Sequence, residues 1–328
     1  MVKKMDRISA VIPTYNSSRT IMKVIMSILD QVEEIIVIDD CSNDNTTLIV
    51  ENLKKINNNI ILIKNNEKLG LSGSIKRGLD YTTHETVLIL HDDIVFFKNN
   101  LINKAIKLLS EINKKDNKVI GISFMYCIPN EIFKEYTFLQ KVYSLTDYII
   151  SKRTEDVEFT IGYSVNAGKA IILPKYLIYK LKLYDNPVLK YGGEDAEASI
   201  LLKRNGYKLL SMPAVQHLHI HKQSGVTYFL KKEILQGKIS GTLARLYGIK
   251  ESDAHLILFK LLVYSGLLVP NVNVLSLFLL IPIYINYIYR IYKFVGLDHG
   301  LLIVPFYKFF KDICLIYGFL YGYIRCKQ

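Results

Sequence analysis

VLILHDDIVFF, residues 87–97, is an apolar run interrupted by two adjacent carboxylates, Asp92 and Asp93. The four apolar residues in front of them predict a buried strand, and the acids fall where that strand ends. In an open α/β sheet, ligands bind outside the carboxyl ends of the strands, where a carboxylate pair suits a hard divalent cation. A solvated turn could contain the same residues, because Asp is common in turns. Other parts of the sequence are needed to distinguish a ligand site from a turn.

Short apolar runs alternate with helix-like segments along the first part of the chain. Strands are predicted over residues 8–12, 34–38, 60–64 and 87–90, with helices over 19–29, 45–55 and 71–81 between them. Near-continuous Val, Ile and Leu strands separated by helices are typical of a parallel sheet with both faces covered. Further along, the pattern predicts a helix over 98–113, a strand over 119–126, a strand or turn region over 161–173, and a helix over 196–205.

Acidic residues stop this pattern at three comparable places. Asp39 and Asp40 follow the second strand, residues 92–93 follow the fourth, and Glu194 with Asp195 follow two glycines and open a helix. Carboxylates can accept hydrogen bonds from nucleoside hydroxyl groups, hold Mg or Mn, or take a proton as a general base. The repetition favours one ligand site at the end of the sheet.

The C-terminal part combines apolar and basic residues. The 328-residue chain is 50% hydrophobic with a formal net charge of +12, and from residue 225 onward it has 12 Lys and Arg against 5 Asp and Glu. Nucleic-acid-binding proteins concentrate positive charge without long apolar runs, whereas a protein on anionic lipid uses both. The composition therefore favours membrane lipid as a partner and excludes nucleic acid.

Two C-terminal segments are candidates for membrane contact. Residues 261–289 contain no charged side chain, and within them 274–291 is long enough for a spanning or re-entrant helix, since about 20 apolar residues cross a bilayer. Residues 301–324 are also apolar, but Lys308, Lys311 and Asp312 share one helix face, which favours an interfacial helix or a second span. A buried helix of a soluble protein is the alternative.

The cysteines and the N-terminus indicate a reducing compartment. Cys41, Cys127, Cys314 and Cys326 have neither zinc-site nor disulfide spacing. The first apolar run is short and is interrupted at Pro13, which is not typical of a secretory signal. We therefore expect a membrane protein whose N-terminal part faces the cytoplasm.

Five motifs, in this order, resemble a family 2 glycosyltransferase of the GT-A fold. They are VIPTYN (11–16), IIVIDDCS (35–42), GLSGSIKRG (70–78), HDD (91–93) and GED (193–195). The resemblance covers about residues 7–225 and implies a Rossmann-like mixed α/β sheet flanked by helices. We expect a catalytic domain over 1–225 and an apolar, helical membrane region over 226–328.

The resemblance also implies a binding site for a nucleotide-diphosphate sugar. Pro13, Tyr15 and Asp40 would line the nucleoside pocket, while Asp39 could equally be a buried structural partner. Arg77 would contact the diphosphate or serve the fold. The complete set of expected donor-binding residues is Pro13, Tyr15, Asn16, Asp39, Asp40, Gly70, Arg77 and Asp92.

The expected cation site departs from the family pattern. The usual Asp-x-Asp is replaced by His91, Asp92 and Asp93, so a histidine stands at the first acid position. The Mg or Mn ion is then expected to bind Asp93, alone or together with Asp92. His217, His219 and His221 alternate, which places them on one side of an extended strand. Family members often have a histidine here that contacts the diphosphate or the cation, and His219 is the expected ligand. A hydrogen-bonded histidine is the alternative.

Asp195 is the expected general base, and Glu194 is the second choice. The base would take the proton of an acceptor hydroxyl while that oxygen attacks the anomeric carbon from the opposite face, which inverts the configuration. Asp195 could also cap the helix that follows, and the two roles are compatible.

The resulting hypothesis is a membrane-attached inverting glycosyltransferase acting on a lipid-linked or glycan acceptor. The alternatives are an inactive membrane-bound scaffold that binds glycans or partners, for which His91 is the support, and a nucleotidyltransferase. The latter would need a Gly-rich basic loop, and residues 13–16 are not one. Residue patterns do not specify the donor sugar, the base, the acceptor or the linkage.

Overall fold

The computed structural model describes residues 7–96, 99–147, 149–151, 159–162, 169–189, 192–217, 225–252, 254–296 and 298–326. The chain divides into two compact units, one formed by Met1–Pro129 with Ser151–Ile220, the other by Asn130–Ile150 with His221–Gln328. The division expected at residue 225 did not anticipate that residues 130–150 group with the C-terminal unit.

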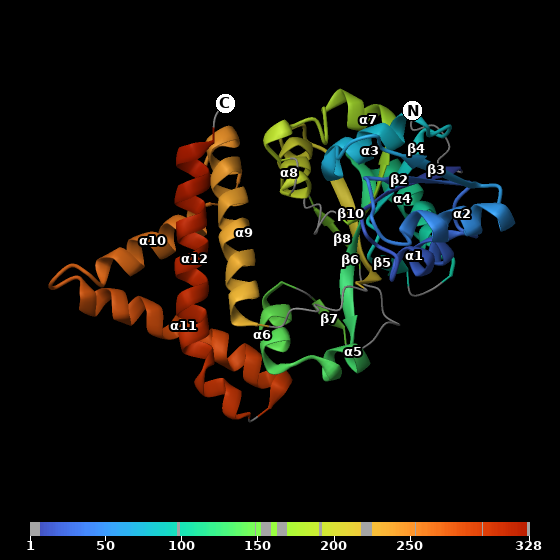
Figure 1. Ribbon diagram of the computed structural model, residues 1–328. Helices are drawn as coiled ribbons and strands as arrows, with labels where there is room; N and C mark the ends of the chain where they lie inside the picture. The colour runs from blue at the N-terminus through green and yellow to red at the C-terminus, as the bar shows by residue number, and fades with distance from the viewer. Residues whose placement is uncertain are drawn as a thin grey trace. The chain divides into compact units, whose positions relative to one another are not determined.

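The first unit is an α/β sheet structure (Figure 1). Its elements are, in chain order, β1 (Ile8–Thr14), α1 (Ile21–Ile28), β2 (Glu34–Asp39), α2 (Thr46–Ile56), β3 (Ile60–Lys64), α3 (Gly70–Asp80), β4 (Thr86–Leu90), β5 (Ile94–Phe96), α4 (Leu101–Lys115), β6 (Val119–Pro129), β8 (Thr160–Gly162), β9 (Ala170–Pro174), α7 (Lys175–Lys180), η1 (Pro187–Leu189), α8 (Glu194–Arg204) and β10 (Lys208–His217). The short β7 (Ile149–Ser151) lies at the division between the units.

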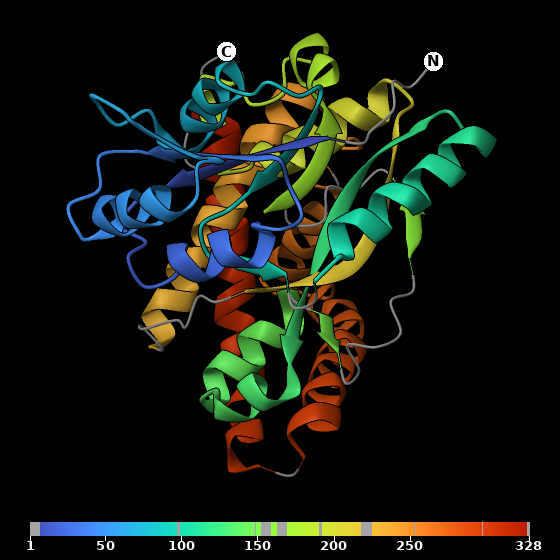
Figure 2. The same cartoon turned by 90° about the vertical axis from the view of Figure 1, so that its right-hand side faces the viewer.

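The sheet is mixed. Its main strand order is β3-β2-β1-β4-β9-β6-β10-β5. The first four strands are parallel, as the alternation of strands and helices predicts, but β9 runs antiparallel to β4 and β6. The long strands β6 and β10 lie side by side and parallel (Figure 2). The mixed sheet that the family resemblance implies is therefore confirmed. The direction of β9 could not be predicted, because a short apolar strand has the same pattern in either direction.

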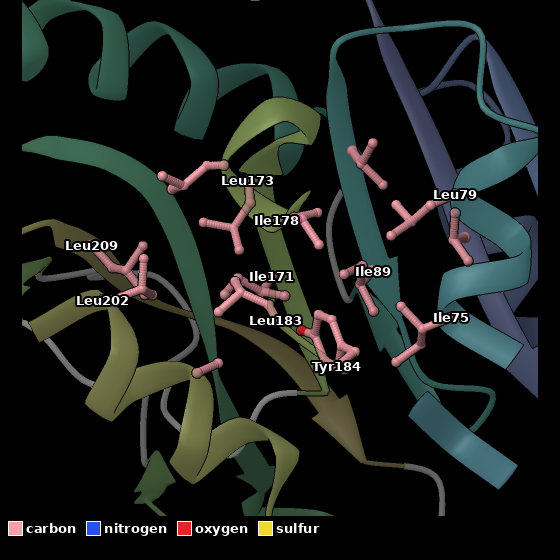
Figure 3. Packing of buried hydrophobic residues seen from close by; sticks show 14 of the residues in the cluster. Ile75, Leu79, Ile89, Ile171, Leu173, Ile178, Leu183, Tyr184, Leu202 and Leu209 are labelled. Carbon is pink, nitrogen blue, oxygen red and sulfur yellow. The ribbon is translucent and has the colours of Figure 1, made fainter. Parts of the chain in front are cut away.

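One face of this sheet is covered by α3, α7 and α8. Figure 3 shows Ile75 and Leu79 of α3 facing Ile89 of β4, and Ile178 and Leu202 packed near β9 and β10. Alternate residues of β4 enter this cluster, and the residues between them are also buried on the opposite face. Burial on both faces explains why the strands are continuous apolar runs.

Pro13 ends one strand ladder of the sheet. β1 pairs with β4 from Ile8 to Val11 only, while its pairing with β2 continues to Thr14. Proline has no N–H to donate, so it is tolerated where one ladder stops. From Ile12 of β1 and Leu90 of β4 onward the two strands are no longer paired, which leaves a gap between their carboxyl ends. It lies where the parallel strand order reverses, which is the usual ligand position in such sheets.

The second unit is helical. Its elements are α5 (Asn130–Glu135), α6 (Phe138–Asp147), α9 (Val226–Tyr247), α10 (His255–Gly266), α11 (Asn273–Val295), η2 (His299–Leu302) and α12 (Val304–Arg325). Among the described residues, one helix is long and apolar enough to cross a membrane, Asn273–Lys293, and only 11% of its apolar window is buried. The core helix of a soluble domain would be mostly buried.

The charged residues of α12 lie on one face, as expected, and that face is buried. Asp312 pairs with Lys308 and, at 2.9 Å, with Lys260 of α10, while Lys311 pairs with Glu233 of α9 at 2.9 Å. Lys308, Lys311 and Asp312 are all under 10% exposed. These charges therefore bind other helices, and the interfacial position of α12 stays a prediction.

Glycines bring α9 and α12 into backbone contact. A Cβ added to Gly237 or Gly241 would lie well under 3.0 Å from carbonyl oxygens of α12, and one added to Gly318 or Gly322 would lie equally close to carbonyls of α9. The two glycines of each pair are four residues apart in the sequence, which places them on one face of their helix. Such small-residue faces are common where helices pack closely in apolar surroundings.

We expect Gly318→Ala to destabilise this helix pair by about 1–3 kcal/mol, because the methyl group overlaps the Ile234 carbonyl. The measurement is the thermal unfolding midpoint in detergent. Gly225→Ala is the control, since its added Cβ would meet nothing closer than 3.8 Å. Equal midpoints for Gly318→Ala and the unchanged protein would contradict this packing.

Candidate functional site

The loops after β1 and β4 are joined by Asp92. One oxygen of its carboxylate accepts hydrogen bonds from the backbone N–H of Tyr15, at 3.2 Å, and from the hydroxyl of Ser17. Burial, with the neighbouring charge of Asp93, raises the pKa of Asp92 to about 6. Asp92 therefore links the loop after β1 to the carboxyl end of β4.

Tyr15 and Asn16 lie exposed at this gap. The Tyr15 ring is 43% exposed, and the ammonium of Lys68 lies 4.1 Å from its centroid and 2.6 Å from its hydroxyl oxygen. Asn16 has a φ of 53° and binds the loop after β2, donating its N–H to Ser42 and accepting from Asn43. A flat, accessible ring in this position can receive a planar base.

Asp40 is occupied by the chain itself. Its carboxylate accepts from the Asn65 side chain at 2.8 Å, from Leu69 N at 2.7 Å and from Gly70 N at 2.9 Å. Gly70 has a φ of 74°, which a glycine adopts without strain. Asn65 in turn accepts from Arg77 at 3.0 Å. Asp40, Gly70 and Arg77 therefore hold the start of α3 against the end of β3.

Asp39 differs from Asp40, because one of its carboxylate oxygens has no hydrogen-bond partner among the described residues. It is 3% exposed, and its Oδ2 accepts from Ser42 N at 3.1 Å, but its Oδ1 has no hydrogen-bond partner among the residues described. A buried carboxylate oxygen without a donor is costly unless a ligand supplies one. The Asp40 carboxylate is therefore bound by the chain itself, whereas one oxygen of Asp39 has no partner among the described residues. The donor-binding roles expected for both acids stay predictions.

Asp93 forms an ion pair with Lys169. The Lys169 ammonium lies 3.2 Å from Asp93 Oδ2, with side chains 28% and 18% exposed. The backbone N–H of His91 donates to the Lys169 carbonyl at 2.8 Å. Within the described ranges, no group of three His, Cys, Asp or Glu side chains forms a metal site. His219 and His221 lie outside these ranges, as does the side chain of His217. The described residues therefore do not by themselves fit a divalent cation.

Glu194 and Asp195 begin α8, after a glycine with a φ of 93°. Glu194 is buried, and its Oε2 has no hydrogen-bond partner in the described part of the chain; burial and the adjacent Asp195 raise its pKa to about 7. Asp195 is partly exposed and accepts from Ala196 N at 2.8 Å, and burial raises its pKa as well. A carboxyl group with a raised pKa can accept a proton near neutral pH.

Several residues at this site were missed from sequence. Asn65 directly follows β3, so the rule that singled out Asp39 and Asp92, a polar residue at a strand end, would have found it. Ser17 and Lys68 lie in loops that carry no such signal. Lys169 precedes β9, and only the antiparallel direction of β9 brings it to the end of β4.

The sequence profile "Glycosyl transferase family 2" matches residues 9–178, just over half of the chain. The chain belongs to glycosyl transferase family 2. The matched residues include β1, β2, the end of β4 and Lys169, but not Glu194 or Asp195.

Two curated relatives of this family member are named for glucosyl transfer. The chain is 34% identical over 128 residues to GalNAc(5)-diNAcBac-PP-undecaprenol beta-1,3-glucosyltransferase of Campylobacter jejuni, a match covering 38% of this chain and 39% of the relative. It is 32% identical over 122 residues to UDP-Glc:alpha-D-GlcNAc-diphosphoundecaprenol beta-1,3-glucosyltransferase WfgD of Escherichia coli, covering 36% and 44%. The matches thus span less than half the length of either relative.

A solved structure shares the fold. Mannosyltransferase PcManGT from Pyrobaculum calidifontis, in complex with GDP-Man and Mn²⁺, aligns with a TM-score of 0.58 over 98% of this chain and 88% of its own, at 15% identity. The fold of this family 2 chain is therefore the expected GT-A fold, a mixed α/β sheet with flanking helices.

The buried position of Glu194 predicts a pH-dependent stability. The pKa of Glu194 in the folded protein is raised from 4.5 to about 7. Its contribution to the folding stability is therefore fully present below pH 4.5 and is lost as the pH rises through about 7. Glu194→Gln cannot ionise. We therefore expect its free energy of unfolding, relative to that of the unchanged protein, to rise by up to about 3 kcal/mol as the pH increases over this window.

Thermal unfolding midpoints between pH 4.5 and 8.5 measure this difference. Glu111→Gln, a substitution on the exposed side of α4, is the control and should show no such trend. A constant difference between Glu194→Gln and the unchanged protein would show that Glu194 is not a buried acid with a raised pKa.

Proposed function

We propose that the chain transfers a sugar from a nucleotide-diphosphate sugar to a hydroxyl group of a lipid-linked or glycan acceptor, with inversion. The observation that carries this proposal is the junction at Asp92, which binds the loop after β1 to the end of β4. This junction is at the reversal of strand order, where α/β sheets bind ligands, and it lies within the residues matched by the family profile.

The nucleoside would bind beside Tyr15 and Asp39. The exposed Tyr15 ring offers a stacking surface, worth about 1–3 kcal/mol per base in proteins that stack nucleic-acid bases. Asp39 Oδ1 would accept a hydrogen bond from the base or ribose, which supplies the donor that the free chain lacks. Asp40, Gly70 and Arg77 would then support the pocket from behind.

Asp195 would be the general base. It is the partly exposed member of the acidic pair, so an acceptor hydroxyl can reach it, whereas Glu194 is buried. Asp195 takes the hydroxyl proton as the acceptor oxygen forms a bond to the anomeric carbon. The bond from that carbon to the diphosphate breaks, and its electron pair leaves on the nucleoside diphosphate. Attack opposite the leaving group inverts the configuration.

The divalent cation at Asp93 and His219 stays a prediction. The PcManGT complex contains Mn²⁺, and a cation, when bound, offsets charge on a leaving diphosphate. In this chain Asp93 is the described candidate ligand, and its carboxylate is paired with Lys169.

A lipid-linked acceptor is favoured by two observations. Both glucosyltransferase relatives are named for undecaprenol-linked substrates. The helical unit exposes many large apolar side chains, among them Leu268 at 86% and Phe278 at 68%, and exposed apolar residues of this size suit contact with a bilayer. Attachment to the membrane would bring such an acceptor to the enzyme, and the cytoplasmic side stays a prediction.

We expect Asp195→Asn to lower sugar transfer by about 10²- to 10⁴-fold and to leave nucleotide binding unchanged, because it removes the base without touching the nucleoside pocket. The assay follows transfer from radiolabelled nucleotide sugars, with nucleotide affinity measured by calorimetry. Asp185→Asn, an exposed substitution in the same unit, is the control. Unchanged transfer by Asp195→Asn would reject this base, and absence of nucleotide binding by the unchanged protein would favour an inactive scaffold.

We also expect the full-length chain to float with vesicles that contain anionic lipid. Leu268→Asp combined with Phe278→Asp should reduce the bound fraction about tenfold or more, since each buried apolar side chain contributes about 1.5–3 kcal/mol. Ile56→Asp, at an 80% exposed site in the first unit, is the matched control. A protein that stays in the dense fraction in low salt would contradict membrane attachment.

A further inference from the structure

Lys169 is fixed to the end of β4 by the backbone. β9 pairs antiparallel with β4, with Ala170 opposite Leu90, and the next bond runs from His91 N to the Lys169 carbonyl at 2.8 Å. Lys169 therefore lies directly across from His91, the residue at the first acid position of the expected cation motif. The ladder holds the lysine backbone in place independently of its side chain.

The Lys169 side chain brings a positive charge to the acids of the site. Its ammonium lies 3.2 Å from Asp93 Oδ2, and the Lys169 side chain is 28% exposed, so a ligand can approach it. Its charge also acts on Glu194 and Asp195, where it favours the ionised carboxylates. One ammonium is thus close to the expected cation ligand and within electrostatic reach of the proposed base.

The substitution at residue 91 and the position of Lys169 have a common explanation. A histidine in place of the first acid removes an oxygen ligand and a negative charge, both of which hold a divalent cation. Lys169, which is paired with the remaining acid Asp93, places a positive charge where that cation would lie. Lysine binds phosphate as a compact point charge, so it can meet a diphosphate without a metal.

We infer that Lys169 is a diphosphate-binding residue, and that its ammonium lets the chain bind a nucleoside diphosphate without a divalent cation. This inference rests on the proposed function and names a residue that the expected site did not include. On binding, the ammonium contacts Asp93 and a phosphate oxygen together. It then stabilises the negative charge that the diphosphate gains when its bond to the sugar breaks.

The test is calorimetric titration of the full-length protein with UDP and with GDP, in EDTA and in Mn²⁺. The unchanged protein should bind one of these nucleotides in EDTA. Lys169→Met should weaken binding in EDTA by about 10- to 100-fold, the loss of one charge-assisted contact, and Lys169→Arg should keep most of it. Lys203→Met, which removes an exposed lysine from α8, is the matched control and should bind normally.

Each other outcome rejects the inference in a distinguishable way. Binding by the unchanged protein in Mn²⁺ but not in EDTA would reject metal-free binding and leave the proposed function intact. Equal affinities of the unchanged protein and Lys169→Met in EDTA would reject the role of Lys169. No binding of either nucleotide under any condition would reject the proposed function and this inference with it. Thermal midpoints establish that Lys169→Met and Lys169→Arg are folded before titration.

Discussion

Three hydrogen bonds to the carboxylate of Asp40 hold together the edge of the sheet on which the site is built. They fix Asn65 at the end of β3 and the backbone of Leu69 and Gly70 at the start of α3. Through Asn65 the same network reaches Ser74 and Arg77. With the loops held in this way, Tyr15 and Asp39 can remain available for a ligand. A pre-organised edge reduces the ordering that binding would otherwise require.

The carboxyl ends of β1, β2 and β4 could be predicted from sequence because each strand is a continuous apolar run ending in a polar residue. The direction of β9 could not, since residues 170–174 have the same apolar pattern in either direction. Lys169 was missed for this reason. The sequence also could not predict that Asp40, and not Asp39, receives the backbone N–H groups of Leu69 and Gly70, because both acids follow one strand and only the path of the next loop decides between them.

The acids at residues 92–93 and 194–195 have distinct surroundings. Asp92 is a junction between loops, with a pKa raised to about 6, and Asp93 is one half of an ion pair. The family profile ends at residue 178, before α8. The proposal of Asp195 as the base is therefore supported by its partial exposure, in contrast to the buried Glu194, and by its place in the GED motif. His219 lies outside the described residues, which leaves the expected cation ligand a prediction.

The buried charges of the helical unit also restrict how this part of the protein can vary. Asp312 is bound by Lys260 and Lys308 and accepts a hydrogen bond from Tyr264 at 2.9 Å. Removing one member would leave another charge buried without its counterpart, so substitutions here have to occur together. The exposed apolar residues of α11 have no such constraint. We therefore expect related chains to exchange the outer apolar residues freely while retaining or losing the buried charges as a set.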